Sequence, residues 1–410
     1  MDKIIRKLNK KQANRKTAVS MVMLLILLLA GCCGEKASAK ERVILDCDMG
    51  VMNDDALALS MLLQGESHGD FEIIGITLEG GNYFIDASFE TDGVLQTGEW
   101  NNTKQFLESV GRTDIPIYKG TDYPTGFHEK SISDLAVYYE NADYLPFNDN
   151  YGAIHAFKNT VSGELCNSDA ASDFMIQAVR EHPGEVAIIA IGPTMNIARA
   201  VEKDPAFAEN VKAIYYMGGA LGDCYEAETV TGKKVYAVEG ANVTPYAEYN
   251  VLYDPNAFLE CITAGFPKQY IVPAELNAEC DASVAARLKA AEGNTAIADR
   301  WCKEYDNRLP NYPYWDPLTA FAYLYPECIV HAEERYVTVN TDRNDDRFGE
   351  TTAIGTDEYK ALSENEKSIY GRAVVIHETE SFWDKTIKLL TTSADQYLGH
   401  LRLKQREDIK

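Results

Sequence analysis

From Glu41 onward, short runs of β-branched and apolar residues alternate with longer stretches of helical pattern. Strands separated by helices pair in parallel through right-handed crossovers, so the alternation predicts an α/β fold whose mostly parallel central sheet has helices on both faces. The predicted strands are Val43–Leu45, Ile73–Thr77, Ile117–Tyr118, Val186–Ile191, Ala213–Met217 and Tyr270–Val272. The predicted helices are Asp54–Leu63, Phe89–Val110, Ser168–Arg180, Asn196–Val201, Pro255–Ala264, Thr295–Asp306 and Pro317–Leu324.

The alternation continues without an internal repeat or a linker rich in proline and glycine, which indicates one domain over residues 42–395. Residues 396–410 form a polar C-terminal tail. The charge-dense stretch Asp342–Lys367 is expected to be a surface loop or hairpin. In a sheet of this kind ligands bind beyond the carboxyl ends of the strands, so the loops after Leu45, Thr77, Ile191 and Met217 are the candidate site.

The charge of the chain excludes some classes of partner. Its formal net charge is −24, and a surface that acidic repels phosphate backbones, which argues against nucleic acid as a partner. Seven histidines and no CxxC spacing among nine cysteines give no zinc signature, and cysteines in apolar surroundings behave as small hydrophobes. A carboxylate site for a hard cation fits this composition better.

The N-terminus has the organisation of an export signal. Seven basic residues in the first sixteen precede the thirteen-residue run Ala18–Ala30, in which only Ser20 is polar. That run is shorter than the roughly 20 residues that a membrane-spanning helix needs. A basic stretch followed by a short apolar run is typical of a secretory signal.

The end of the signal, Leu29-Ala30-Gly31-Cys32, resembles the lipobox of bacterial lipoproteins. The resemblance implies cleavage before Cys32, lipidation of its thiol, a signal peptide over 1–31 and a tether over 32–41. The mature domain would then be held on the extracytoplasmic side of the bacterial cell envelope by a lipid and would not span the membrane. The alternative is an uncleaved signal anchor in which Cys32 is incidental.

A carboxylate-rich loop follows the first predicted strand. Asp46, Asp48, Asp54 and Asp55 fall within ten residues, and like charges this close repel one another. A divalent cation with oxygen ligands, calcium or magnesium, would resolve the repulsion. Two alternatives stay open at this point. The Asp54-Asp55 pair could cap the following helix, or the Asp-x-Asp motif could be the nucleophile loop of a haloacid-dehalogenase-type phosphatase.

Taken in order, the loop motifs resemble those of the inosine-uridine-preferring nucleoside hydrolase family, from about Val43 to Leu390. The shared segments are the Asp46–Leu59 loop, Gly75–Thr77 with Gly81-Asn82, Gly111–Gly120, Ile191–Ala198, Met217–Gly219, Asn242–Asn250 with Asp254-Pro255, and Trp315–Ala320. Any one segment is weak, but their ordered recurrence after predicted strands is specific. The resemblance implies a Rossmann-like α/β fold and hydrolysis of ribonucleosides to free base and ribose.

Carried over residue by residue, the resemblance also implies a Ca²⁺ site and a ribose pocket. The metal ligands would be Asp48, Asp55, Asp316 and the main-chain carbonyl of Met195, where the family usually has threonine. The ribose contacts would come from Asp54, Asn82, Met217, Asn242, Glu248 and Asn250. Asp48 would act as general base on a water that the calcium orients, while carboxylates stabilise the oxocarbenium-like sugar. Members of the family commonly form dimers or tetramers, which implies a homo-oligomer.

Two features depart from the commonest family pattern. Where a histidine usually precedes the last metal aspartate, this chain has Trp315, with Tyr312 nearby. That pairing resembles the purine-preferring branch, in which aromatic stacking on the base assists its departure, and Tyr249 could add a further aromatic wall. The alternative is that Trp315 and Tyr312 are core aromatics. The loop before Asp54 is also longer than usual, so Asn53 competes with Asp54 for the ribose contact.

Other assignments are less specific. Asp46 is expected to be a structural acceptor at the end of the strand, and the region 123–168 forms the expected rim of the pocket, with a role that its sequence does not define. A non-catalytic nucleoside-binding lipoprotein is the competing interpretation of the whole chain. The carboxylate set argues against it, because a pure binding protein has no need of a metal that activates water.

Overall fold

The computed structural model describes residues 40–50, 53–69, 71–81, 84–91, 94–127, 160–162, 164–221, 225–228, 234–237, 246–280, 282–290, 293–304, 313–345 and 347–397. Within it, Glu41–Lys410 forms one compact unit. The predicted single domain therefore matches one unit of the structure. The predicted signal sequence, Cys32 and the residues from 398 onward lie outside the described residues.

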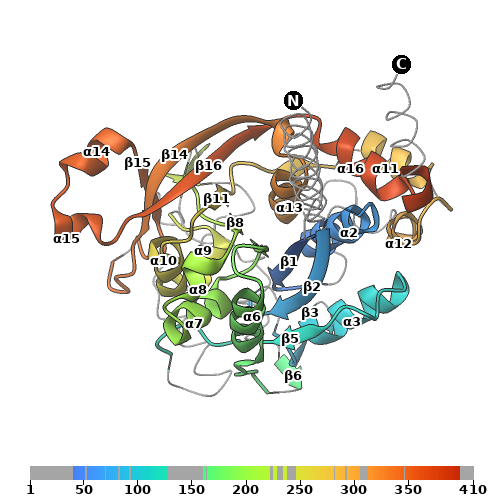
Figure 1. The fold of residues 1–410 in the computed structure, drawn as a ribbon, viewed down its shortest axis with the longest axis horizontal. Coiled ribbons are helices and arrows are strands. Elements are labelled where there is room, and N and C mark those ends of the chain that lie inside the picture. Colours follow the sequence, from blue (N-terminus) through green and yellow to red (C-terminus); the bar gives the residue numbers. More distant parts are fainter. Residues whose placement is uncertain are drawn as a thin grey trace, which may run out of the picture. The chain divides into compact units, whose positions relative to one another are not determined.

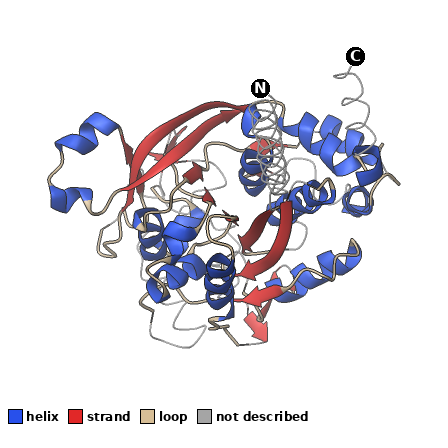
Figure 2. Ribbon diagram, in the orientation of Figure 1, coloured by secondary structure: helices blue, strands red, loops and turns tan. Residues whose placement is uncertain are grey.

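The fold is built on a nine-stranded sheet of the described residues, in the order β15-β14-β16-β11-β8-β7-β1-β2-β5. Its strands are β1 Glu41–Cys47, β2 Phe71–Leu78, β5 Ile117–Lys119, β7 Val186–Ala190, β8 Ala213–Met217, β11 Gln269–Val272, β14 Ile329–Val339, β15 Thr351–Ile354 and β16 Gly371–Thr379. Neighbours from β16 to β5 pair in parallel, whereas β14 is antiparallel to both β15 and β16. Figure 2 shows β14 and β16 as two long neighbouring strands toward one end of the sheet. All six predicted strands are confirmed.

Helices flank the sheet on both faces, as predicted (Figure 1). The helices of the described chain are α2 Asp54–Ser67, α3 Glu99–Ser109, α6 Ala170–Glu181, α7 Met195–Lys203, α8 Phe207–Asn210, α9 Tyr249–Tyr253, α10 Pro255–Thr263, α11 Ala282–Lys289, α12 Ala296–Glu304, α13 Asp316–Leu324, α14 Thr356–Ala361, α15 Glu364–Lys367 and α16 Phe382–Thr391, with a 3₁₀ turn η1 at Pro326–Cys328.

Alternation along the strands divides the core into two layers. In β1, Val43, Leu45 and Cys47 pack with residues of α2, α13 and α16, whereas Ile44 packs with residues of α6, α7 and α10. Successive side chains of a strand point to opposite faces, so a strand of almost unbroken apolar residues is one buried on both sides. This burial fixes the carboxyl end of β1 in the middle of the molecule.

One predicted helix was wrong over its first half. Phe89–Val110 begins with the strands β3 Ser88–Thr91 and β4 Val94–Gln96, and the helix α3 starts only at Glu99. Thr91 pairs with Val94 in an antiparallel hairpin. The two residues between them in the sequence are Asp-Gly, the dipeptide typical of two-residue hairpin loops, and this signal outweighs the helical spacing of the apolar residues.

The smaller strands lie outside the main sheet. β6 Thr160–Ser162 completes a three-stranded sheet with β3 and β4, while β9 Tyr225–Glu228 pairs with β10 Lys234–Ala237 and β12 Ala278–Glu279 with β13 Pro313–Tyr314. The charge-dense stretch Asp342–Lys367 contains the turn of the β14–β15 hairpin, as expected, and also the helices α14 and α15, which were not predicted. The capping box of Ser363 with Glu366 marks the start of α15.

The strand order places a topological switch point at the end of β1. From β1 the chain of parallel strands runs through β2 to β5 on one side and through β7, β8 and β11 on the other. Ligands in open α/β sheets bind where the order reverses in this way, beyond the carboxyl ends of the strands. The loops that follow β1, β2, β7 and β8 meet at this place, in agreement with the expected position of the site.

Candidate active site

Three buried carboxylates converge from two helices that are far apart in the sequence. Asp54 and Asp55 lie in the first turn of α2 and Asp316 is the first residue of α13, and each offers an oxygen within 4.8 Å of the others. Figure 1 shows α2 and α13 as neighbours above β1. Both helices begin here, with Pro317 fixing the start of α13, so their N-terminal dipoles favour negative charge at this point.

Burial and mutual repulsion destabilise the charged forms of these groups. The pKa of Asp55 is raised well above its usual value, by burial first and then by the charges of Asp48 and Asp54. The pKa of Asp316 is raised in the same way, by burial and by Asp54, Asp55 and Asp48. No lysine or arginine is among the buried side chains of the described residues. Among the described residues, no buried basic side chain offsets the charge of this cluster, which is the situation that a bound cation would relieve.

The donor set fits a hard metal ion. Asp55 Oδ1 is buried and has no hydrogen-bond partner among the described residues, although buried polar atoms are normally paired. Carboxylate oxygens without sulfur or imidazole are the ligands that calcium and magnesium prefer. Asp54, Asp55 and Asp316 are thus able to hold such an ion at the N-termini of α2 and α13.

Asp48 lies directly after β1 and is fully buried. Two glycines pack against its side chain: a Cβ on Gly81 would overlap its carboxylate, and one on Gly192 would lie 3.1 Å from Oδ1. Asp48 is outside the tight group of three carboxylates, but its charge raises the pKa of both Asp55 and Asp316. The close approach of two backbones holds this carboxylate in one place beside the cluster.

Asn53 and Asp54, which compete for the ribose contact, have different surroundings. Asn53 is the N-cap residue of α2, and its side-chain amide donates to Asp55 Oδ2 at 2.6 Å. The carboxylate of Asp54 accepts from the backbone N–H of Trp315 at 3.4 Å. Because the amide of Asn53 is engaged with Asp55, Asp54 remains the better candidate for the ribose contact, in addition to its place in the carboxylate group that could hold the ion.

Asp46 acts as a hydrogen-bond acceptor at the strand end, as expected. Its Oδ1 accepts from Thr77 Oγ1 at 2.6 Å and from Asn196 Nδ2 at 2.9 Å. Burial raises its pKa to about 6, against the effect of these bonds. Glu79 is fully buried at the end of β2, and burial, followed by the charge of the neighbouring Asp46, raises its pKa well above its usual value.

Glu248 and Asn250 are fixed at the start of α9. Glu248 accepts from the backbone N–H groups of Gly219, Asn250 and Val251 at 2.9, 2.8 and 3.1 Å, and burial raises its pKa to about 7. The amide of Asn250 donates to the carbonyl of Ile191 at 3.0 Å and contacts Met217 Sδ at 3.2 Å. These bonds gather Glu248, Asn250 and Met217 at the ends of β7 and β8, where the ribose contacts were expected.

Aromatic side chains close the site from two directions. The Tyr249 hydroxyl donates to the carbonyl of Gly81 at 2.6 Å, so this ring is tied to the loop that packs on Asp48. The Trp315 indole donates to the carbonyl of Ala274 at 2.9 Å and is 8% exposed. Trp315 is thus held rigidly beside Asp316, in surroundings that suit both a core aromatic and the wall of a base pocket.

Met195 is the first residue of α7 and is buried in the core layer of that helix. Carbonyls in a helix accept the bond of the N–H four residues later, so metal ligation would use the second lone pair of this oxygen. Its role as a ligand stays a prediction. Asn82, Asn242 and Tyr312, and residues 128–159 of the expected rim, lie outside the described residues.

Among the buried carboxyl groups that the sequence interpretation missed, Glu79 and Glu99 are fully buried and close to the predicted site. Glu79 directly follows a predicted strand, so the strand-end rule could have found it. Its backbone-bound oxygen accepts from the N–H of Asn196 at 3.0 Å. Glu99 begins a helix that the sequence placed ten residues too early, and no motif marks it.

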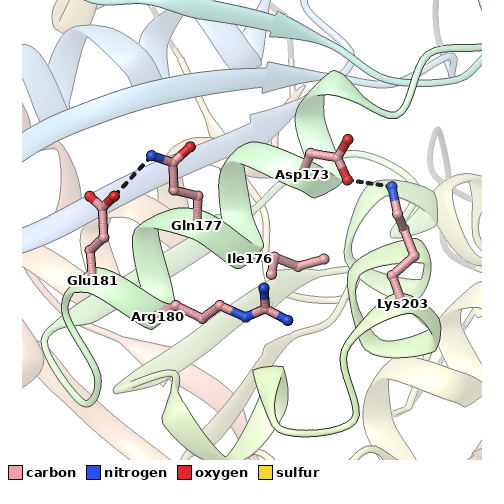
Figure 3. Close-up of a pocket in the computed structure, with 6 residues that line it drawn as sticks. All are labelled: Asp173, Ile176, Gln177, Arg180, Glu181 and Lys203. Carbon is pink, nitrogen blue, oxygen red and sulfur yellow. Dashed lines mark hydrogen bonds and ion pairs between the residues drawn. The ribbon is translucent and has the colours of Figure 1, made fainter.

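A second hollow lies on the surface between α6 and α7 (Figure 3). It has a volume of about 440 Å³ and is lined by Asp173, Ile176, Gln177, Arg180, Glu181 and Lys203. Lys203 forms an ion pair with Asp173, and Arg180 bonds to Asp204 at 2.9 Å. Glu181 accepts from the amide of Gln177 at 2.9 Å. The hollow is thus lined by two acids and two bases and carries no net charge that would select a ligand.

Known proteins resemble the chain over most of its length. The family model described as inosine-uridine preferring nucleoside hydrolase matches residues 43–384. A probable uridine nucleosidase 2 from Arabidopsis thaliana is 28% identical over 305 residues, 72% of this chain and 80% of that protein. A pyrimidine-specific ribonucleoside hydrolase from Escherichia coli (strain SE11) is 26% identical over 84% of this chain and 95% of its own length.

Solved structures share the fold. The purine-preferring ribonucleoside hydrolase from Gardnerella vaginalis superimposes with a TM-score of 0.58 at 18% identity, covering 87% of this chain and 99% of that one. The plant nucleoside hydrolase PpNRh1 gives a TM-score of 0.55 at 21% identity, covering 86% and 98%. At these sequence identities the solved structures establish the fold alone. The assignment to a family of hydrolases rests on the match to the family model.

Proposed function

The chain belongs to the inosine-uridine preferring nucleoside hydrolase family, and from this premise we propose that it is a calcium-dependent hydrolase that releases free base and ribose from purine ribonucleosides. Membership of the family makes it a nucleoside hydrolase and removes the phosphatase interpretation. Calcium as the metal, the preference for purines and the individual roles of residues are the proposed part.

The observation that carries the proposal is the meeting of Asp54, Asp55 and Asp316 beside Asp48, with no buried cation among the described side chains. Calcium bound there would supply positive charge and a polarised water. Asp48 takes the proton of the attacking water, because its carboxylate is held against Gly81 and Gly192 and cannot swing away. A non-catalytic binding protein would have no use for this arrangement.

The ribose would lie between Asp54 and the Glu248–Asn250 turn, with Met217 under the ring. Glu248 keeps lone pairs for a sugar hydroxyl beyond those that bond the backbone, since a carboxylate offers about four acceptor sites. As the N-glycosidic bond breaks, positive charge grows on the ribose. The surrounding carboxylates stabilise that charge more strongly than they stabilise the neutral substrate, which lowers the barrier.

The preference for purines rests on Trp315. A tryptophan beside the last metal ligand offers a larger stacking face to a purine than to a pyrimidine. If this is its role, Trp315→Leu lowers kcat/KM for inosine at least about tenfold more than for uridine, whereas Trp315→Phe, which keeps an aromatic face, retains more of the purine activity. Equal losses for both bases in the two variants would assign Trp315 to packing alone.

The direct test uses purified residues 34–410 with a panel of purine and pyrimidine nucleosides. Released base and ribose are quantified with added calcium and again after a chelator. Purine release that the chelator abolishes is the expected result. Faster release from uridine or cytidine would overturn the purine preference. No release from any nucleoside, with calcium bound, would favour the binding-protein alternative.

The same proposal places the protein on the outside of the cytoplasmic membrane, in the bacterial cell envelope. Its support is the basic, apolar and lipobox order of residues 1–32, with Cys32 as the lipidated residue. Assembly into a homo-oligomer rests on the family resemblance alone, and light scattering of the purified domain would measure it.

A further inference from the structure

Glu99 is a buried acid that the reaction described above does not use. It is the first residue of α3 and has no solvent exposure. Neither of its carboxylate oxygens has a hydrogen-bond partner among the described residues. Buried carboxyl groups are almost always paired, so two oxygens without a partner in the described part of the chain leave room for a bound water or ion.

The first turn of α3 packs against the loop that carries Asp48. The side-chain amide of Asn102, three residues after Glu99 and on the same side of the helix, donates to the carbonyl of Met49 at 3.1 Å. The backbone N–H of Glu99 donates to the carbonyl of Phe84 at 3.0 Å. With both ends of the turn anchored, the carboxyl group of Glu99 is placed beside the end of β1.

Burial raises the pKa of Glu99 well above its usual value, and the negative charges of Asp48, Asp122, Asp55 and Glu79 raise it further. Asp122 is already satisfied, because it accepts from the backbone N–H groups of Ile85 and Cys166 at 2.9 and 2.6 Å. The N-terminal dipole of α3 offsets only a fraction of a charge. The positive field that Glu99 lacks is the one that a cation at Asp55 and Asp316 would provide.

We propose that Glu99 is the outer carboxylate of the metal centre, which accepts hydrogen bonds from water on the ion and strengthens its binding from the Asp48 side. The inference rests on the metal of the proposed function and assigns that metal a residue from α3. Glu99 is a positioning residue in this role, because it acts on the ion and its water and does not touch the sugar. Mutation of a residue that hydrogen-bonds to the ligands or water of a metal typically weakens metal binding by about 10- to 100-fold.

The test is calcium binding to metal-free protein, measured by titration calorimetry together with the Tm in chelator and in calcium. Glu99→Gln is expected to weaken the Kd for calcium at least about tenfold and to leave the metal-free Tm unchanged or raised, because it removes a repelled, unpaired acid. Glu99→Asp keeps the charge and is expected to recover part of the affinity. Glu108→Gln is the matched control: it removes the same charge from the exposed face of the same helix.

A Kd for Glu99→Gln within about twofold of wild type, or a lower metal-free Tm with unchanged Kd, would overturn the inference and make Glu99 a packing residue. Calcium binding by Glu99→Asp that is as weak as that of Glu99→Gln would also overturn the inference, because the negative charge would then not be what strengthens binding. If the Glu99→Gln protein does not fold, Glu99→Asp is compared with wild type in its place. If the wild-type protein binds no calcium, the proposed function itself is wrong about its metal. These readings do not depend on nucleoside turnover, so the two failures are distinguishable.

Discussion

Asp48 is the residue on which the proposed chemistry depends most directly. Asp48→Asn keeps the size of the side chain and one oxygen but removes the proton acceptor. We expect kcat to fall by about 10²- to 10⁴-fold while nucleoside binding is largely retained. The measurement is kcat for the preferred nucleoside beside its Kd from calorimetry. Asp173→Asn, on the surface hollow of α6, is the control that should keep wild-type turnover.

Gly81 is tested by giving it a side chain. A Cβ at this position would overlap the carboxylate of Asp48, and the carbonyl of Gly81 also holds the hydroxyl of Tyr249. Gly81→Ala should therefore displace the general base and lower kcat/KM by about 100-fold, the usual effect of a misplacement near 1 Å. Gly355→Ala is the control, since its Cβ would make only ordinary contacts, with Arg335 Nη1 at 3.4 Å and Glu358 Oε2 at 3.9 Å. Full activity of Gly81→Ala would mean that Asp48 needs no fixed position.

At the scale of elements, Asp122 links the entry to α3 with the entry to α6. It accepts from the N–H groups of Ile85 and Cys166, and burial raises its pKa from 3.8 to about 7. The folded protein binds this proton more tightly than the unfolded chain. The stabilisation is therefore fully present below about pH 4 and is lost as the pH rises through about 7, a change on the order of 4 kcal/mol.

Asp122→Asn should remove that part of the pH dependence. The free energy of unfolding of wild type minus that of the variant is expected to shrink steadily between about pH 4 and pH 7. Urea unfolding in chelator measures it, and Asp357→Asn, at a fully exposed side chain, should follow wild type in parallel. A difference that stays constant across the range would show that Asp122 does not titrate between the two states.

At this scale, the sequence could predict the features that depend on residues close together in the chain. The strands and the loops after β1, β7 and β8 were predictable, because apolar runs and carboxylate spacing are local. The true start of α3 was not, because the Asp-Gly hairpin before it was read as helix. Glu99 could not be assigned to the site from the sequence either. Its position depends on the long-range hydrogen bond between Asn102 and Met49. Tertiary contacts of this kind leave no periodic trace.

At the scale of the whole molecule, negative charge matters in two places: among the buried acids of the interior and on the surface that would face a membrane. The buried acids of the described chain are offset by no buried lysine or arginine, so a metal bound at Asp54, Asp55 and Asp316 would stabilise the fold as well as serve the reaction. The chain as a whole carries −24, and seven of its 39 lysines and arginines lie in the first sixteen residues, in the part that a signal peptidase would remove. The mature domain would be repelled by anionic lipids. In addition, none of the described helices is long and apolar enough to cross a membrane.

If Cys32 carries the lipid, that bond alone retains the domain at a surface that repels it. Cys32→Ser in the full chain should incorporate no labelled fatty acid and should keep the mass of the uncleaved signal. Cys33→Ser, at the neighbouring thiol, is the control and should be labelled and cleaved like wild type. High salt should not release the lipidated protein from membranes, because electrostatic attraction contributes nothing to its retention. Labelling of Cys32→Ser would place the acyl group elsewhere, and release of wild type by salt would mean that the protein is held by charge.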